Sequence, residues 1–271
     1  MPEDVAVFAV SEHRQILWID PVVIVHYGRN QRGRTIPAFN SPVPRECTEA
    51  QLERVENWLY KPGTLVSVFA GGEKLGSAAV HSSNIKDSGC VDLSAKISYG
   101  GTGKPRLATN TGSEIPGHVS TRRAATPAEA SILRQLALEW LIDYGLDKQL
   151  LQRGRLGPVI STILRNSAGR ALVGRFDVTS KYAIHRLFAI AEQNQGRYQL
   201  TLANVRIQRD VDDGTDITER EYLDQLDLDN DGLDEVVTSA SHYESWTYTI
   251  WRFNASHKVW QHAYTGGGGG A

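Results

Sequence analysis

Short runs of apolar and β-branched residues, separated by glycine, proline and polar turn residues, recur along the chain and predict β-strands. In the first half these runs lie at residues 5–10, 15–19, 22–27, 65–69, 75–80 and 90–99. Gly71 and Gly72 separate two of the runs, which predicts a tight hairpin. From about Leu156 the chain is β-like to its end. Residues 28–45 and 100–125 are rich in polar and turn-forming residues, and we expect loops there.

A first helix is expected to begin at Thr48, because Thr48 and Gln51 have the spacing of a capping box. Apolar residues follow on one face of this helix, at Leu52, Val55 and Leu59. Pro62 and Gly63 then predict its end.

A stronger helix signal covers residues 127–144. Thr126 and Glu129 form a predicted capping box, and Pro127 occupies the first helical position. Gly145 stands where a C-terminal cap belongs. The helix has a broad apolar face made of Ile132, Leu133, Leu136, Ala137, Trp140 and Leu141. We expect this face to pack on the sheet that follows, or the helix to join two halves of the molecule.

Two blocks in the second half are weakly similar at an offset of 63 residues. The offset places Leu187 on Ile250 and Phe188 on Trp251, and each block reads as loop, strand, strand, turn, strand. Either an internal repeat or a chance similarity between amphipathic hairpins explains this. We therefore predict an α+β fold, with mixed strands and one or two helices first. The second half is expected to be an antiparallel β region with two weak hairpin repeats.

This pattern divides the chain into an N-terminal α+β region at 1–150, a C-terminal β-repeat region at 151–265 and a flexible glycine-rich tail at 266–271. Of the 271 residues, 41% are hydrophobic and 22% are charged, which predicts a packed core. The net charge of −2 and the dispersed basic residues argue against a nucleic-acid partner. No apolar run is long enough to predict a membrane span.

Cys47 and Cys90 are the two cysteines of the chain. A disulfide between them and a pair of buried free thiols are both compatible with their spacing. No signal peptide is visible in the first residues.

The segment from Asp227 to Glu235 holds the most distinctive chemistry. Asp227, Asp229 and Asp231 alternate along the chain, Gly232 follows, and Glu235 comes three residues after the glycine. Such a density of like charge is repulsive unless a cation neutralises it, and Ca²⁺ prefers oxygen ligands of this kind.

An EF-hand is not expected at this position, because Thr238 stands where that motif needs a bidentate glutamate. The residues after the loop also favour a strand over a helix. The pattern resembles the calcium loop of FG-GAP and VCBS-type repeats, written D-x-[DN]-x-D-G-x-x-[DE] and followed by a short apolar strand. The resemblance implies side-chain ligands at Asp227, Asp229, Asp231 and Glu235, and a backbone carbonyl ligand at Leu233. It also implies β-hairpin repeats in an extracellular or periplasmic protein with an adhesive role.

The alternative for the acidic segment is a solvated Asp-Gly turn between two strands. In the calcium interpretation Asp234 is expected to face solvent. Trp246, Trp251 and Trp260 fit either one aromatic face of a core sheet, which we favour, or a carbohydrate-stacking surface.

The sequence therefore predicts a non-enzymatic, calcium-stabilised, exported or surface-associated binding protein for an unidentified protein or carbohydrate ligand. The alternative is a hydrolase with its site in the 100–125 loop or between the two halves. Polar residues are available there, but no spacing identifies a nucleophile and its base; they are His118, Ser120, Arg122, Arg123 and Asp143.

Overall fold

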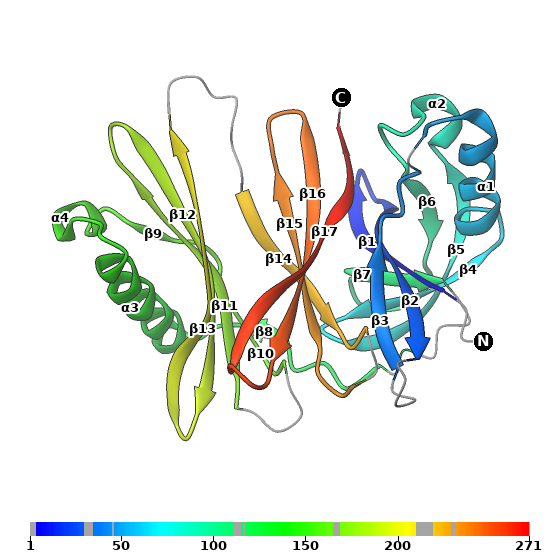
Figure 1. The fold of residues 1–271 in the computed structure, drawn as a ribbon. Coiled ribbons are helices and arrows are strands. Elements are labelled where there is room, and N and C mark those ends of the chain that lie inside the picture. The colour runs from blue at the N-terminus through cyan, green and yellow to red at the C-terminus, as the bar shows by residue number, and fades with distance from the viewer. Residues whose placement is uncertain are drawn as a thin grey trace.

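A computed structural model describes residues 4–29, 35–44, 46–110, 115, 117–164, 169–209, 219–228 and 231–270. It contains an N-terminal β-barrel, two further antiparallel sheets and a helical layer (Figure 1). The predicted α+β class is confirmed, although β-structure is more extensive than two hairpin repeats would give.

Six strands of the described N-terminal region close into a barrel in the order β1-β7-β4-β5-β6-β2, because β1 also pairs with β2. A further strand, β3, extends this sheet by pairing with β2. The strands are β1 (Val5–His13), β2 (Ile16–Arg29), β3 (Thr35–Asn40), β4 (Leu65–Ala70), β5 (Glu73–Ser83), β6 (Ala95–Ser98) and β7 (Leu107–Asn110). The predicted hairpin at Gly71 and Gly72 is confirmed, and both glycines have positive φ, at 62° and 80°.

The second sheet has the strand order β13-β12-β11-β10-β8, with β9 paired to β11. Its strands are β8 (Arg123–Ala124), β9 (Arg155–Leu156), β10 (Ile160–Thr162), β11 (Ala171–Thr179), β12 (Ala183–Asn194) and β13 (Arg197–Arg209). The third sheet is a meander in chain order, formed by β14 (Glu219–Leu226), β15 (Glu235–Ser241), β16 (Ser245–Asn254) and β17 (Val259–Gly270).

The two similar sequence blocks correspond to β11–β13 and β15–β17, and both are antiparallel three-stranded units within larger sheets. Equivalent residues also lie on equivalent faces. Phe188 and Trp251 meet in the core between the second and third sheets, whereas Leu187 and Ile250 point to the opposite face of their own sheet.

The described helices are α1 (Glu49–Leu59), α2 (Ile85–Ser88), α3 (Pro127–Asp143) and α4 (Lys148–Leu151). The prediction for α3 is confirmed, including both hydrogen bonds of its capping box and proline in its first turn. For α1 the predicted capping box is wrong, because the Thr48 side chain makes no capping hydrogen bond. None of these helices is long and apolar enough to cross a membrane within the described residues.

The elements form layers (Figure 1), with the barrel beside the third sheet, the second sheet beyond it, and α3 on the far side. Separate apolar clusters fill the barrel interior, the barrel–third-sheet contact, the space between the two sheets, and the contact of α3 with the second sheet. The third sheet is therefore covered on both faces. Trp251 and Trp260 belong to the core between the sheets at 5% and 4% exposure, whereas Trp246 packs on the opposite face of the third sheet, against the barrel. The prediction of a core position is therefore met for Trp251 and Trp260, but the three tryptophans do not share one face.

Two predicted loops contain strands. Within 28–45, β2 continues to Arg29 and β3 pairs with it; within 100–125, β7 pairs with both β1 and β4. Sequence patterns missed them because the short β7 segment and the proline-containing β3 are strands through pairing with distant partners. Conversely, only Ala95–Ser98 of the predicted strand at 90–99 is β-structure.

The glycine-rich end is the clearest correction, because Gly266 to Gly270 form the last part of β17 instead of a flexible tail. Backbone oxygens crowd these glycines. A Cβ on Gly267 would lie 2.2 Å from the Pro21 carbonyl oxygen, and one on Gly269 would lie 2.3 Å from that of Val91. Only residues without side chains allow this close approach. Val91 follows Cys90, which forms a disulfide with Cys47.

Candidate functional site

The acidic segment connects β14 to β15 at the point where the third sheet meets the end of the barrel (Figure 1). Asp227 is 6% exposed, and its carboxylate accepts hydrogen bonds from the backbone N–H groups of Asp231, at 3.1 Å, and Gly232, at 2.9 Å. Gly232 has a φ of 84°, which allows the chain to turn back toward Asp227. The described residues on the two sides of the loop thus meet at one carboxylate.

The other predicted ligands occupy different environments. Asp231 is exposed, and its Oδ1 accepts the N–H of Leu233 at 2.8 Å. Glu235 is 1% exposed: its Oε2 accepts the N–H of Leu228 in the loop, and its Oε1 pairs with Arg252 Nε at 3.0 Å. Asp229 lies outside the described residues. Both carboxylate oxygens of Glu235 thus have partners within the protein.

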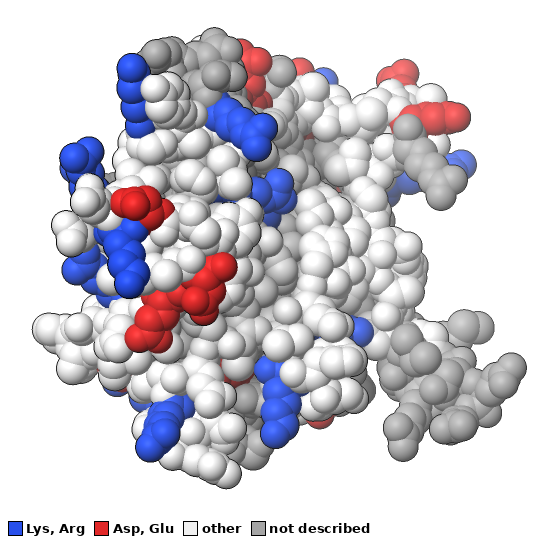
Figure 2. All heavy atoms as spheres, turned by 60° about the vertical axis from the view of Figure 1, so that its left-hand side comes forward, with Lys and Arg blue, Asp and Glu red and all other residues white. Residues whose placement is uncertain are grey.

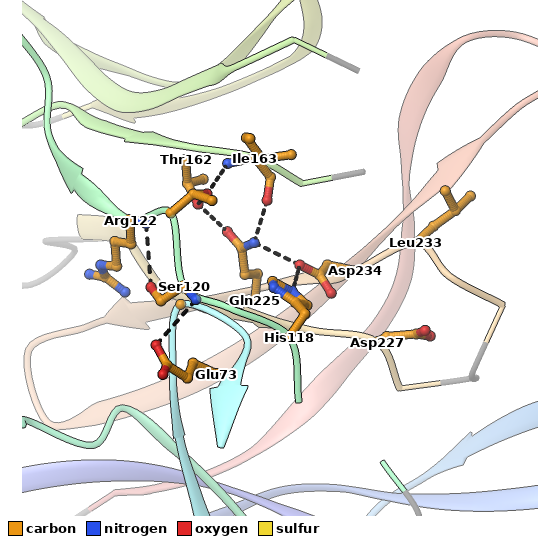
Figure 3. Close-up of polar contacts among 12 residues, drawn as sticks. Glu73, His118, Ser120, Arg122, Thr162, Ile163, Gln225, Asp227, Leu233 and Asp234 are labelled. Atoms are coloured by element: carbon orange, nitrogen blue, oxygen red, sulfur yellow. Dashed lines mark hydrogen bonds and ion pairs between the residues drawn. The ribbon is translucent and has the colours of Figure 1, made fainter. Parts of the chain in front are cut away.

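Asp234 was expected to face solvent, and this is wrong. It is 5% exposed, and its Oδ2 lies 2.7 Å from His118 Nε2 and 2.6 Å from Gln225 Nε2 (Figure 3). Its partners come from the segment after the barrel and from β14. The sequence pattern could not show this contact, because 116 residues separate His118 from Asp234.

His118 and Asp234 form an ion pair at neutral pH. The hydrogen bond that His118 donates to Asp234 raises the pKa of His118 to about 9, against a smaller opposing effect of burial. The charge of Asp227 adds to this increase. His118 also covers the β4–β5 turn closely, since a Cβ on Gly72 would lie 2.1 Å from its Nε2.

Gln225 links this ion pair to the second sheet (Figure 3). Its Nε2 also donates to the Ile163 carbonyl at 2.7 Å, and its Oε1 accepts from Thr162 Oγ1 at 3.0 Å and Tyr222 Oη at 2.7 Å. Gln225 and Thr162 are both fully buried, so these bonds satisfy groups that water does not reach.

A second ion pair lies on the other side of the junction. Arg122 Nη1 donates to Asp224 Oδ1 at 2.6 Å, and Asp224 Oδ2 accepts the Gly71 N–H at 2.7 Å. Asp224 is 0% exposed, and burial raises its pKa despite the opposing charge of Arg122. These contacts join the barrel turn, the 117–125 segment and β14, so we call the cluster of His118, Arg122, Asp224, Gln225 and Asp234 the junction cluster.

The residues weighed for a hydrolase do not form a nucleophile–base pair in the described structure. Asp234 occupies His118 Nε2, and His118 Nδ1 lies 3.2 Å from the Val119 carbonyl. Ser120 Oγ accepts the Arg122 N–H, while Arg123 pairs with Glu129. Because His118 is protonated at neutral pH, it is a poor general base there.

No group of three or more His, Cys, Asp or Glu residues arranged to hold a metal ion occurs among the residues that the structure describes. Figure 2 shows basic and acidic side chains interspersed on one face, without a large patch of either sign. No protein-family model, curated protein or solved structure matches the chain.

Proposed function

We propose that the chain is a non-enzymatic binding protein of an extracellular or periplasmic compartment, in which the β14–β15 loop binds Ca²⁺. One observation carries this proposal, the buried charge at Asp227, which two backbone N–H groups and the nearby His118 compensate only in part. Burial raises the pKa of Asp227, and the charges of Asp231 and Asp234 add to the increase. The cations nearby are engaged elsewhere: His118 pairs with Asp234, and Arg252 pairs with Glu235. A bound cation would relieve this repulsion.

The described residues fit a calcium ion in part. Asp227 and Asp231 supply carboxylates on the two sides of the turn at Gly232, where the Asp227 carboxylate also accepts the N–H groups of Asp231 and Gly232. Ca²⁺ accepts carboxylates, backbone carbonyls and water together, so a site with few protein ligands is chemically reasonable. Glu235 is not part of the proposed site, since its carboxylate binds Leu228 and Arg252.

A groove next to β16 and β17 supports the proposed role in ligand binding, and Glu235 connects it to the loop. Glu235 follows the loop directly and holds Arg252, whose guanidinium lies 5.0 Å from the centre of the Phe39 ring. The groove there has a volume of about 570 Å³. Its lining comes mainly from β3, β16 and β17 and combines aromatic and aliphatic residues with amide, imidazole and guanidinium groups; it includes Phe39, Arg252, Asn254, Gln261 and His262. An ordered loop would fix this face for a protein or carbohydrate ligand.

The Cys47–Cys90 disulfide supports the proposed compartment, because disulfides form and persist mainly where the surroundings are oxidising.

Thermal and urea unfolding with and without calcium test the proposal. At a free Ca²⁺ concentration of about 100 times Kd, we expect the free energy of unfolding to rise by about 2.7 kcal/mol. Asp231→Asn should remove this response while leaving the calcium-free stability nearly unchanged, because Asp231 is exposed and asparagine can still accept the Leu233 N–H.

Asp87→Asn is the matched control, since Asp87 is an exposed carboxylate on α2, remote in sequence from the loop. This variant should respond to calcium as the wild type does. Equal calcium responses in the wild type and Asp231→Asn, or no response at millimolar Ca²⁺, would show that the loop is not a calcium site.

A further inference from the structure

The contact between the barrel and the third sheet contains a buried carboxylate that the proposed calcium site does not involve. Asp20 lies in β2 directly before Pro21, where the pairing of β1 with β2 changes register. Its side chain points into the contact with β16 and is 6% exposed. We call the contact of β2 with β16 and β17 the seam.

Two donors from β16 meet on one oxygen of Asp20. The Tyr248 hydroxyl donates to Asp20 Oδ2 at 2.6 Å, and Trp246 Nε1 donates to the same atom. Asp20 Oδ1 has no hydrogen-bond partner among the described residues. One carboxylate oxygen thus holds the third sheet to the barrel, and the other is free to take a proton without breaking either bond.

No cation neutralises Asp20 in the described part of the chain. The titratable groups that act on it are Tyr248 from β16, Asp92 from the loop after α2, and Tyr60 at the end of α1. Trp246 contributes a neutral donor, and the glycines at the end of β17 carry no titratable side chain. A negative charge here is therefore buried beside neutral groups and another acid.

The seam has little freedom to rearrange around this charge. Gly267 has a φ of 63°, and a Cβ there would lie 2.2 Å from the Pro21 carbonyl oxygen and 2.8 Å from that of Val22. At the end of the strand, the Gly270 N–H donates to the Val91 carbonyl at 3.1 Å. Relief of the buried charge must come from a proton or from separation of β16 and β17 from the barrel.

We propose that the seam is a proton-sensitive joint, closed most tightly when Asp20 is protonated and opened most easily when Asp20 is charged. Burial raises the pKa of Asp20 to about 6, with Asp92 adding to the increase and the two donors opposing it. In an opened seam, water returns the carboxyl to its ordinary range near 3.8.

The two pKa values of Asp20, in the closed and the opened seam, determine how the opening equilibrium depends on pH. Below the ordinary pKa both states are protonated, so the seam is not weakened. As the pH rises through about 6 the closed seam must release its proton, and the opening equilibrium increases. A difference of about two pKa units corresponds to an increase of roughly a hundredfold. The joint is therefore tighter in an acidic medium than in a neutral one.

Hydrogen exchange measured by mass spectrometry between pH 4 and pH 7.5 tests this, after correction for the intrinsic exchange rate at each pH. We expect the opening constant for β17 in the intact wild-type protein to rise by up to about a hundredfold, with a midpoint near pH 6. Peptides from β11 and β12 in the second sheet serve as the internal reference. In Asp20→Asn the rise should be absent.

Two further variants should shift the midpoint of the pH-dependent exchange in opposite directions. They test the proposal even if Asp20→Asn does not fold. Tyr248→Phe removes a donor that lowers the pKa of Asp20, so the midpoint should move to higher pH. Asp92→Asn removes a charge that raises this pKa, so the midpoint should move to lower pH. A wild-type seam whose exchange does not depend on pH relative to the reference peptides would overturn the proposal. Shifts of the same sign in the two variants would also overturn it.

Discussion

Replacement of His118 by glutamine tests whether the junction cluster stabilises the fold through charge. Glutamine retains an N–H donor for Asp234 but cannot be protonated. Asp234 is 5% exposed, so it would keep a buried negative charge without its cationic partner. We expect a lower free energy of unfolding at neutral pH.

The size of the effect follows from the pKa of His118, which Asp234 raises from 6.5 to about 9. At 1.36 kcal/mol per pKa unit this sets an upper limit of about 3 kcal/mol. The His118 side chain is 34% exposed, so solvent screening reduces the expected loss to about 1–2 kcal/mol. Because the pKa is raised, this contribution is complete below about pH 6.5 and is lost as the pH rises through about 9.

Urea unfolding from pH 6 to pH 10 measures this contribution as the difference in stability between the wild type and His118→Gln. The difference should be largest at pH 6–7 and should nearly vanish by pH 10. His81→Gln, which changes an exposed histidine on β5, should follow the wild type throughout. If the difference in unfolding free energy between the wild type and His118→Gln stays constant from pH 6 to pH 10, His118 does not stabilise the fold as a cation.

Two further pairs of variants make the same substitution at a packed position and at a more open one, and compare the loss of stability. Arg122→Ala leaves Asp224 buried without its cation and should cost about 3–5 kcal/mol of unfolding free energy, whereas Arg123→Ala removes a more exposed ion pair and should cost clearly less. Urea unfolding checks both, and equal losses would contradict the role of burial. Gly267→Ala should lower stability by at least about 2 kcal/mol, because it adds a clash with a β2 carbonyl to the strain of a positive φ. Gly196→Ala has the same backbone strain but nothing within 4 Å of its Cβ, so its thermal unfolding midpoint should fall less.

Local signals determined which elements could be predicted from the sequence. The α3 prediction succeeded because its cap, first-turn proline and terminal glycine all lie within about one helix length. The β4–β5 hairpin succeeded for the same reason, since two adjacent glycines define its turn.

Features that depend on distant partners were missed. A run of glycines has no side chains to predict burial, so β17 resembled a flexible tail. Its close contact with Pro21 is the reason for glycine at Gly267, and the two are 246 positions apart in the chain. The pairing of β1 with β7 in the barrel is equally non-local.

The charges of the acidic loop were also misjudged from the sequence, because several of their partners are distant in the chain. Counting carboxylates in the sequence indicated repulsion that a metal ion must neutralise. In the structure His118 neutralises Asp234, Arg252 pairs with Glu235, and backbone N–H groups bind Asp227. The proposed site therefore depends on Asp227 and Asp231 at the turn, and not on the full set of carboxylates in the segment.

Direct titration of the metal-free protein with Ca²⁺ by isothermal calorimetry tests whether the β14–β15 loop binds calcium. We expect saturable binding of one ion per chain in the wild type, and loss of that binding in Asp231→Asn. Failure of the wild type to take up Ca²⁺ at millimolar concentration, or unchanged uptake by the variant, would contradict it.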